Sequence, residues 1–312
     1  MKRWKEISLA VTAGIFAAAN VAMSIYIQRT IVRRNRKRIN KTADLSDFVP
    51  EASYTASSVM FHAADGCRIS GLLMKPQNPN GHAIVVCHGV AHDKRSAVRF
   101  VQYLAREGYT LLPIDFRAHG ESEGDLVTYG LREKEDLHAA IRYLRQTVGI
   151  TGCVGVLGAS MGASIAIQAA AESTEIDALV LDSPFASLKV ISEESVARIT
   201  GLPKALLWIP TRLAFLLIRI LHKFDVPEVE PAERVRDVRT PMLLIHGSKD
   251  VRIPVHHTIE IHENASCEKE LWIVEGAGHL GGYLMHTREY QLRVLDFFRR
   301  HFQDTAILES LR

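Results

Sequence analysis

An α/β fold built on a mostly parallel sheet is predicted by three features of this sequence. Short, continuously apolar segments alternate with stretches of helical period, a pattern typical of a sheet covered by helices on both faces. Residues 154–166 pass from an apolar strand through a glycine-flanked turn into a helix of small residues. With 312 residues, 47% hydrophobic and 23% charged, the chain can bury one large core and still carry an appendage.

The first part of this core is assigned to residues 57–185. It opens with a hairpin, because Asp65-Gly66 stands between two alternating segments within residues 59–74. The elements expected after the hairpin are a strand at 83–87, a helix at 97–106, a strand at 109–114, a helix at 131–148, the strand and helix of residues 154–166, and a strand at 178–181. The second part, residues 240–304, is expected to hold strands at 242–245 and 271–274 and a closing helix at 287–302, before a tail at 305–312.

A helical cap is predicted between the two parts, at residues 186–239, which have helical patterning and no strand pattern. The apolar run at 202–221 within it has a rival interpretation as a membrane span. Lys204, Arg212 and Arg219 argue against a span, because each basic residue near the bilayer centre costs about 2.5–3.5 kcal/mol. We therefore expect cap helices.

The N-terminal residues 1–28 are predicted to form a transmembrane anchor, followed by a basic linker at 29–56. The run from Ile7 to Ile27 is almost uncharged, and about 20 apolar residues suffice to cross a bilayer as a helix. A cleaved signal peptide is the alternative. The length of the apolar run and the basic stretch that follows it disfavour that interpretation.

The orientation of the anchor is predicted from its basic flanks. Three basic residues precede the span (Lys2, Arg3 and Lys5), and seven lie between Arg29 and Lys41. Because the more basic flank stays in the cytoplasm, we expect a single-pass protein whose main domain faces the cytoplasm. Export of that domain, with the short N-terminus inside, is the alternative.

The composition excludes several classes of protein. The formal net charge is +3, and its excess lies mostly before residue 42, so no basic footprint for nucleic acid is indicated. The four cysteines show neither CxxC pairing nor the spacing of metal ligands: Cys67, Cys87, Cys153 and Cys267. No phosphate-binding loop is visible. We expect neither a metal nor an organic cofactor.

The segment Gly158-Ala159-Ser160-Met161-Gly162 fits the G-x-S-x-G pattern, in which a sharp strand-to-helix turn raises a serine above the sheet edge. Glycine is favoured on both sides because backbone crowds backbone in such a turn. An ordinary turn that happens to hold a serine is the alternative interpretation. The position between an apolar strand and a helix favours a nucleophile.

A serine hydroxyl becomes nucleophilic when a base takes its proton and a third group orients that base. Asp250 follows the strand at 242–245 and His279 follows the strand at 271–274, in the chain order expected after such a serine. Both loops lie at carboxyl ends of strands, so the three side chains are predicted to converge. Taken singly, Asp250 could be a turn residue and His279 a surface histidine.

Two backbone amides are candidates to stabilise a tetrahedral oxyanion. One belongs to Met161, directly after the serine, and the other to Val90, in the loop after the strand at 83–87. His88 in that loop is a rival base. Because it precedes the serine in sequence, it is interpreted as a residue that shapes the loop.

These residues together resemble the α/β-hydrolase superfamily, in particular the serine-hydrolase branch that includes S33-type and prolyl-oligopeptidase-like hydrolases. The resemblance extends from about residue 57 to 302 and is carried by four blocks: His88-Gly89, Asp115–Ser122 (DFRAHGES), Gly158–Gly162, and the loops of Asp250 and His279. It implies an α/β-hydrolase fold with Asp115–Ser122 as a structural loop beside the site.

The resemblance also implies that Asp115, His119 and Asp182 are architectural rather than catalytic. Asp182 is the closest rival among them, because some members of the superfamily draw their acid from that strand. Asp250 has the better-matching position in this chain.

A membrane-anchored serine hydrolase of esters, thioesters, amides or short peptides is therefore predicted, with an acyl-enzyme formed on Ser160. The motifs are specific for the chemistry and not for the substrate. Trp208, Phe215 and Leu216 of the cap are candidates to line an acyl entrance, although a cap helix must bury an apolar face in any case. The alternative is a non-catalytic protein of this fold that binds a lipid or protein partner.

Overall fold

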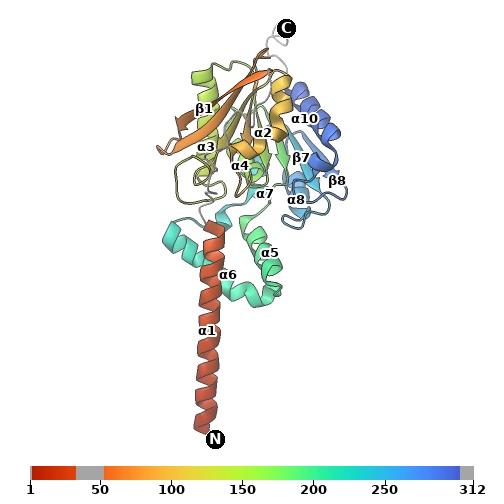
Figure 1. Ribbon diagram of the computed structural model, residues 1–312. Coiled ribbons are helices and arrows are strands. Elements are labelled where there is room, and N and C mark those ends of the chain that lie inside the picture. The colour runs from red at the N-terminus through yellow and green to blue at the C-terminus, as the bar shows by residue number, and fades with distance from the viewer. Residues whose placement is uncertain (1, 33–52, 303–312) are drawn as a thin grey trace. The chain divides into compact units, whose positions relative to one another are not determined.

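Eight strands form one sheet in the described part of the chain, residues 2–32 and 53–302 of a computed structural model (Figure 1). The strands are β1 (Tyr54–His62), β2 (Arg68–Pro76), β3 (Ala83–Cys87), β4 (Thr110–Asp115), β5 (Val154–Ala159), β6 (Ala178–Asp182), β7 (Met242–Gly247) and β8 (Lys269–Val274). Their spatial order is β1-β2-β4-β3-β5-β6-β7-β8, so β5 lies inside the sheet between β3 and β6.

The direction of the strands sets the position of the functional loops. All neighbours from β4 to β8 pair in parallel, whereas β1 pairs with β2, and β2 with β4, in antiparallel fashion. The predicted mostly parallel sheet is confirmed. Because the parallel strands share one direction, the loops after β5, β7 and β8 leave the same edge of the sheet.

Two hydrophobic clusters cover the two faces of the sheet. In β3, Val85 and Cys87 belong to one cluster, and Ile84 and Val86 to the other, as the two-residue period of a strand requires. The first cluster is completed by helices α3 (Glu133–Tyr143), α4 (Met161–Ala170) and α8 (His256–Asn264). The second is completed by α2 (Lys94–Arg106) and α10 (Thr287–His301) (Figure 1).

Several helices differ from expectation. The helix expected at 97–106 begins at Lys94, because the Asp93 carboxylate caps it by accepting from the Ser96 amide at 2.9 Å. The helix expected at 131–148 is α-helical only to Tyr143 and ends in a π-helical turn before Gly149. Helix α8 was not predicted, because Ile259 and Ile261 are its only large apolar residues and give no helical stripe.

The described residues form two compact units, which are named here the sheet unit and the helical unit. The sheet unit comprises residues 53–187 and 230–302. The helical unit comprises α1 (Lys2–Val32), α5 (Leu188–Thr200), α6 (Lys204–His222) and the turn η3 (Val226–Glu228). Within the helical unit, α1 packs against α6.

The boundaries of the units differ from the predicted segments. Residues 186–239 were expected to form one cap, but α7 (Pro231–Arg234) and the 3₁₀ turn Val235–Asp237 belong to the sheet unit. The short helix α9 (Gly282–Met285) precedes the closing helix. Most of the predicted linker, residues 33–52, and the predicted tail, 305–312, lie outside the described residues.

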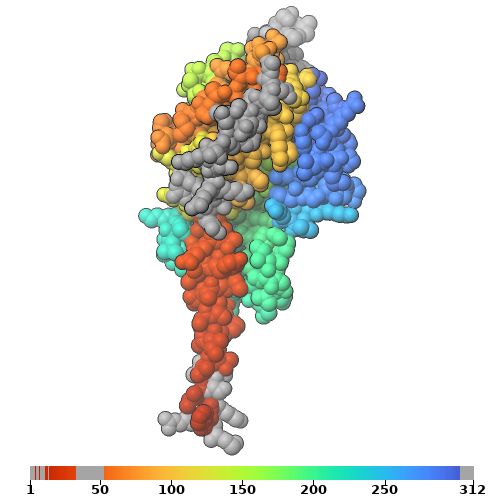
Figure 2. Space-filling model, in the orientation of Figure 1, coloured from red at the N-terminus to blue at the C-terminus, as the bar shows by residue number. Residues whose placement is uncertain are grey.

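Two of the described helices are long and apolar enough to cross a membrane, namely α1 over Gly14–Val32 and α6 over Lys204–His222. Every side chain described between Trp4 and Ala19 of α1 is exposed. Figure 2 shows this half of α1 without a covering element on the visible face. The segment at 202–221, interpreted as cap rather than span, therefore contains a helix of spanning length.

Candidate active site

Ser160 occupies the turn between β5 and α4. Its backbone has φ +54° and ψ −117°, a conformation that costs free energy for a residue with a side chain. Hydrogen bonds hold the turn: the Ser160 amide donates to the Asp182 carbonyl at 2.7 Å, and the Ser160 carbonyl accepts from Ala163 at 3.0 Å. The side chain remains 7% exposed, so the hydroxyl lies just beneath the surface.

The glycines on both sides of Ser160 are required by close backbone contacts. A Cβ on Gly158 would lie 2.7 Å from the Ala163 backbone nitrogen, and a Cβ on Gly162 would lie 2.4 Å from the Cys87 carbonyl oxygen. Gly89, after β3, also touches the turn, because a Cβ there would lie 3.2 Å from the Ser160 Cβ. The G-x-S-x-G pattern thus reflects packing of the turn against α4 and the end of β3.

The structure brings the three predicted side chains together. His279 Nε2 lies 3.1 Å from Ser160 Oγ, and His279 Nδ1 lies 2.6 Å from Asp250 Oδ2. An ionised carboxylate can only accept, so the proton resides on Nδ1. Nε2 is then free to accept the Ser160 hydroxyl proton. This is the orientation that a general base needs.

Asp250 is held as an ionised, oriented acceptor. Its Oδ1 accepts from the amides of Arg252 at 2.8 Å and Ile253 at 3.0 Å, and its Oδ2 also lies 3.3 Å from His246 Nε2. Burial raises the pKa of Asp250, but the hydrogen bonds from His246, His279 and Ile253 outweigh it and leave the pKa below its ordinary value.

Asp182, the rival acid at the end of β6, has different partners. Its two oxygens accept from Ser183 Oγ at 2.9 Å and from the Tyr290 hydroxyl at 3.1 Å. Burial raises its pKa above the ordinary value, although these hydrogen bonds oppose the shift. Of the two carboxylates, Asp250 is the one that hydrogen-bonds His279.

His88, the rival base, joins two loops. Its Nε2 accepts from the Phe116 amide at 3.1 Å, so Nδ1 carries the proton and donates to the Gly89 carbonyl at 2.8 Å. Burial and the neighbouring His119 lower the pKa of His88 to about 3. A neutral ring with both nitrogens engaged is suited to fixing the loop after β3.

The two oxyanion candidates belong to α4 and to the loop after β3. Met161 is the first residue of α4, where backbone amides have no acceptor within the helix and the helix dipole is positive. Val90 is an exposed turn residue next to Gly89, which packs close to Ser160. Their roles as oxyanion donors stay predictions.

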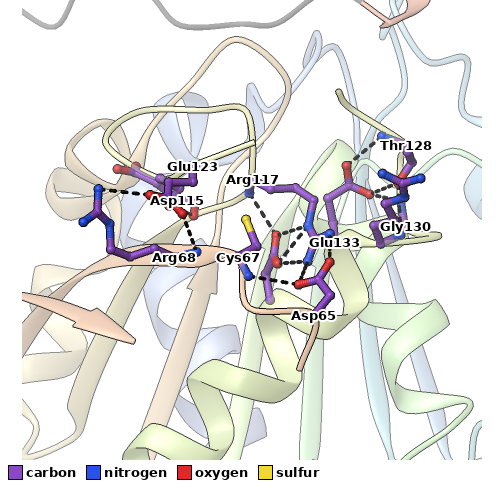
Figure 3. Close-up of polar contacts among 12 residues, drawn as sticks. Asp65, Cys67, Arg68, Asp115, Arg117, Glu123, Thr128, Gly130 and Glu133 are labelled. Carbon is purple, nitrogen blue, oxygen red and sulfur yellow. Dashed lines mark hydrogen bonds and ion pairs between the residues drawn. The ribbon is translucent and has the colours of Figure 1, made fainter. Parts of the chain in front are cut away.

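The DFRAHGES loop is anchored by charged groups (Figure 3). Arg117 donates to Asp136 at 2.6 Å and to Asp65 at 2.7 Å, which ties the loop to α3 and to the β1–β2 turn. Gly120 has φ +46°, and a Cβ there would lie 2.2 Å from the Asp115 carboxylate. The backbone therefore folds directly over that carboxylate, in accord with a structural role.

Lys94 also anchors the DFRAHGES loop, and sequence reasoning missed this residue. The side chain is buried, and its Nζ donates to Asp115 Oδ2 at 2.6 Å, Glu121 Oε2 at 2.6 Å and Ser70 Oγ at 3.0 Å. In the sequence it is one lysine in a polar stretch, which is typical of a solvated helix start. Because Lys94 and Asp115 lie far apart along the chain, no local sequence pattern predicts their contact.

The three predicted entrance residues all lie on α6 of the helical unit, but they do not share one environment. Phe215 is buried, whereas Trp208 and Leu216 are exposed. Helical geometry explains the difference, because consecutive residues such as Phe215 and Leu216 are about 100° apart around the axis. Their part in an acyl entrance stays a prediction.

Comparisons with known proteins bear on the fold and on the class of chemistry. The model of the family described as serine aminopeptidase, S33, matches residues 78–224, a range that contains Ser160 and ends before Asp250. YqkD of Bacillus subtilis, an uncharacterized protein, is 28% identical over 302 residues, covering 94% of this chain and 97% of the relative. Rv2307c of Mycobacterium tuberculosis, also uncharacterized, is 28% identical over 83% of this chain and 85% of its own.

Among solved structures, the esterase Pf2001 of Pyrococcus furiosus superposes with a TM-score of 0.71 at 25% identity, covering 87% of this chain and 99% of the esterase. Acetyl xylan esterase 1 of Thermoanaerobacterium superposes with a TM-score of 0.61 at 16% identity, over 81% of this chain and 85% of that one, and so shares the fold. The chain has the α/β-hydrolase fold, and the matches support a hydrolase with esterase-like neighbours.

Proposed function

We propose that this chain of α/β-hydrolase fold is a membrane-anchored serine hydrolase that forms an acyl-enzyme on Ser160. The observation that carries the proposal is the continuous hydrogen-bonded series from Ser160 Oγ through His279 to Asp250, at 3.1 and 2.6 Å. Ser160 is the only one of the three with a strained backbone, and strain of this kind is commonly maintained where it positions a reactive group.

The mechanism follows from the direction of these hydrogen bonds. His279 Nε2 takes the proton of Ser160 Oγ as the oxygen attacks the substrate carbonyl carbon. Asp250 stabilises the imidazolium that forms and keeps the proton on Nδ1. His279 then protonates the leaving group as the tetrahedral intermediate collapses to the acyl-enzyme. A water molecule, activated by the same base, releases the acid and restores the hydroxyl.

The oxyanion is assigned to the amides of Met161 and Val90. The N-terminus of α4 points its positive end at the nucleophile, and Gly89 leaves the space beside Ser160 open because it lacks a Cβ. Removing one such donor in serine hydrolases costs about 10²–10³-fold in turnover, so the pair supplies a substantial share of catalysis.

Esters are the substrate class that the neighbours favour, since Pf2001 is described as an esterase and acetyl xylan esterase 1 shares the fold. Thioesters, amides and short peptides use the same acyl chemistry and are ranked after esters.

Membrane anchorage is assigned to α1. Its residues from Ile7 to Gln28 include no charged side chain, and large apolar groups such as Ile15 and Phe16 are exposed in the part of the chain that the structure describes. Apolar exposure on this scale suits lipid. The more basic flank follows the helix, so the sheet unit is assigned to the cytoplasmic side.

Hydrolysis of a matched panel tests the proposal. Full-length protein in detergent is given acyl esters, acyl thioesters and aminoacyl amides, with the Ser160→Ala variant as control. We expect ester turnover that falls by about 10³-fold or more in the variant. Equal turnover by the two proteins, or none by either on any of the three classes, favours the non-catalytic alternative.

A further inference from the structure

One side of α6 carries a row of large apolar side chains, most of which are exposed. Leu206, Ile209, Leu213, Leu216 and Ile220 follow one another at intervals of three and four residues, and so lie on one side of the helix. All are exposed except Leu213, which is half-buried. Leu206 is 65% exposed and Ile220 is 62% exposed. These five residues are named here the α6 row.

The opposite side of α6 is already packed. Leu207, Ala214 and Ile218 are buried, and they lie roughly half a turn from the α6 row. A surface helix in water presents one apolar side to its protein and a polar side to solvent. Helix α6 has a buried side and a second, exposed apolar side. Exposure of this second side to water is unfavourable.

The charges beside the α6 row have one sign. The helix contains Lys204, Arg212 and Arg219 and no acidic residue. Arg212 and Arg219 lie about two turns apart on the same flank. The Arg212 guanidinium lies over the ring of Trp208 at 5.8 Å, and Arg219 approaches Asp225 only at 3.9 Å. Leucines and isoleucines bordered by arginine and tryptophan are typical of helices that bind a membrane surface.

The partner of α6 within the helical unit is α1, the proposed anchor. The two helices pack together, and the Gln28 side-chain amide donates to His222 Nε2 at 2.7 Å. Among the described residues of α1, the buried ones are Ser24, Ile27, Gln28, Ile31 and Val32, at the end that the basic residues follow. Helix α6 crosses this end of α1 rather than running along its length (Figure 1). A helix that crosses a span near its end lies close to the bilayer surface.

We propose that α6 is an interfacial helix, with the α6 row immersed among the outer parts of phospholipid acyl chains and Arg212 and Arg219 among anionic headgroups. The inference rests on the anchorage of α1 proposed above. A full crossing by α6 is disfavoured, because Pro210 and Arg212 stand near its middle and Arg212 is exposed. Interfacial helices of this kind bury their apolar side about 5–10 Å deep.

The experiment measures the depth of single tryptophans in the full chain. Trp4 and Trp272 are replaced by Phe so that Trp208 alone reports, and a second protein carries Leu216→Trp with Trp208→Phe. Each is reconstituted into vesicles of phosphatidylcholine and phosphatidylglycerol (3:1) that contain lipid brominated at carbons 6,7 or 11,12. The control carries Leu292→Trp as its only tryptophan, at an exposed apolar position of α10 in the sheet unit.

We expect emission from Trp208 and from position 216 to shift to the blue and to be quenched more by 6,7-bromines than by 11,12-bromines. Position 292 should show neither effect. Replacing phosphatidylglycerol by phosphatidylcholine should weaken the quenching, and Arg212→Gln with Arg219→Gln should remove this dependence on anionic lipid.

Flotation of the same vesicles distinguishes the interfacial assignment of α6 from the anchorage proposed for α1. A chain that floats while Trp208 and position 216 stay unquenched overturns the interfacial assignment and leaves the anchorage intact. Quenching that is strongest with 11,12-bromines replaces it with a span, and unquenched tryptophans in cross-linked dimers assign the α6 row to a second copy. A chain that does not float overturns both anchorage and docking. None of these results depends on Ser160 chemistry.

Discussion

The sheet unit and the helical unit differ in the kinds of side chain that they bury and expose. In the sheet unit, charged side chains are buried and paired: Asp250 with His279 and two amides, and Lys94 with three oxygen acceptors. In the helical unit, large apolar side chains on α1 and α6 are exposed. The difference indicates that one unit is built for chemistry in a preorganised polar setting, and the other for an apolar surrounding.

The largest effect is expected from a change at Asp250. Asp250→Asn should lower ester turnover by about 10⁴-fold, because an amide nitrogen facing His279 Nδ1 stabilises the wrong tautomer. Steady-state kinetics on a soluble short-chain ester measures the loss. Vesicle flotation should be unchanged, since the change lies in the sheet unit.

Asp182→Asn is the matched control for that change. Its two hydrogen bonds come from Ser183 and Tyr290, so we expect a loss of about 1–3 kcal/mol in the free energy of unfolding and turnover within tenfold of the parent. If Asp182→Asn abolished turnover and Asp250→Asn did not, the acid would be assigned to the wrong strand.

A smaller effect is expected from the packing of the serine turn. Gly162→Ala places a Cβ 2.4 Å from the Cys87 carbonyl oxygen, which cannot move without displacing β3. We expect the free energy of unfolding of the sheet unit to fall by about 1–3 kcal/mol, measured by urea unfolding in detergent. Gly278→Ala is the control, because its Cβ would meet nothing within 4 Å. Equal losses in both variants would mean that the contact at Gly162 is not the cause.

The smallest effect is expected in the pH dependence of stability. The pKa of Asp250 is lowered in the folded state, so its contribution to stability is present above the unfolded pKa, near 3.8, and is lost as pH falls through the folded value. The pKa of Asp182 is raised, so its contribution is greatest below the unfolded pKa and is lost as pH rises through the folded value.

Urea unfolding between pH 3.5 and 7 measures both contributions as differences from the Asn variants. The stability advantage of the parent over Asp250→Asn should shrink on acidification, whereas its advantage over Asp182→Asn should grow. Slopes of the same sign for the two variants would contradict the opposite environments described for these carboxylates.

Local signals made the sheet unit predictable from the sequence. The strand at 83–87 was predicted with the same bounds as β3, because a run of five apolar residues between polar flanks indicates a buried strand of that length. The positions of Asp250 and His279 followed from chain order and strand ends. Helix α8 was missed because its burial depends on neighbours brought by the fold, and the buried state of Lys94 depends on Asp115 and Glu121 in the same way.

The helical unit was less predictable because its organisation is long-range. The apolar runs of α1 and α6 were evident, but their packing joins Gln28 to His222 across most of the chain. Nor could the apolar content of α6 show which leucines face outward. The outward-facing leucines could be identified only from the structure, in which Ala214 and Ile218 are buried on the other side of the helix.

Covalent labelling tests the central claim, that Ser160 is an activated nucleophile. Full-length protein in detergent is treated with a fluorophosphonate, followed by intact-mass measurement and peptide mapping. We predict one adduct, on the peptide that contains Ser160, absent from Ser160→Ala and much slower in His279→Ala, with all three proteins folded by circular dichroism. Absence of an adduct on Ser160 in the folded parent, or an undiminished rate in His279→Ala, would contradict the assignment.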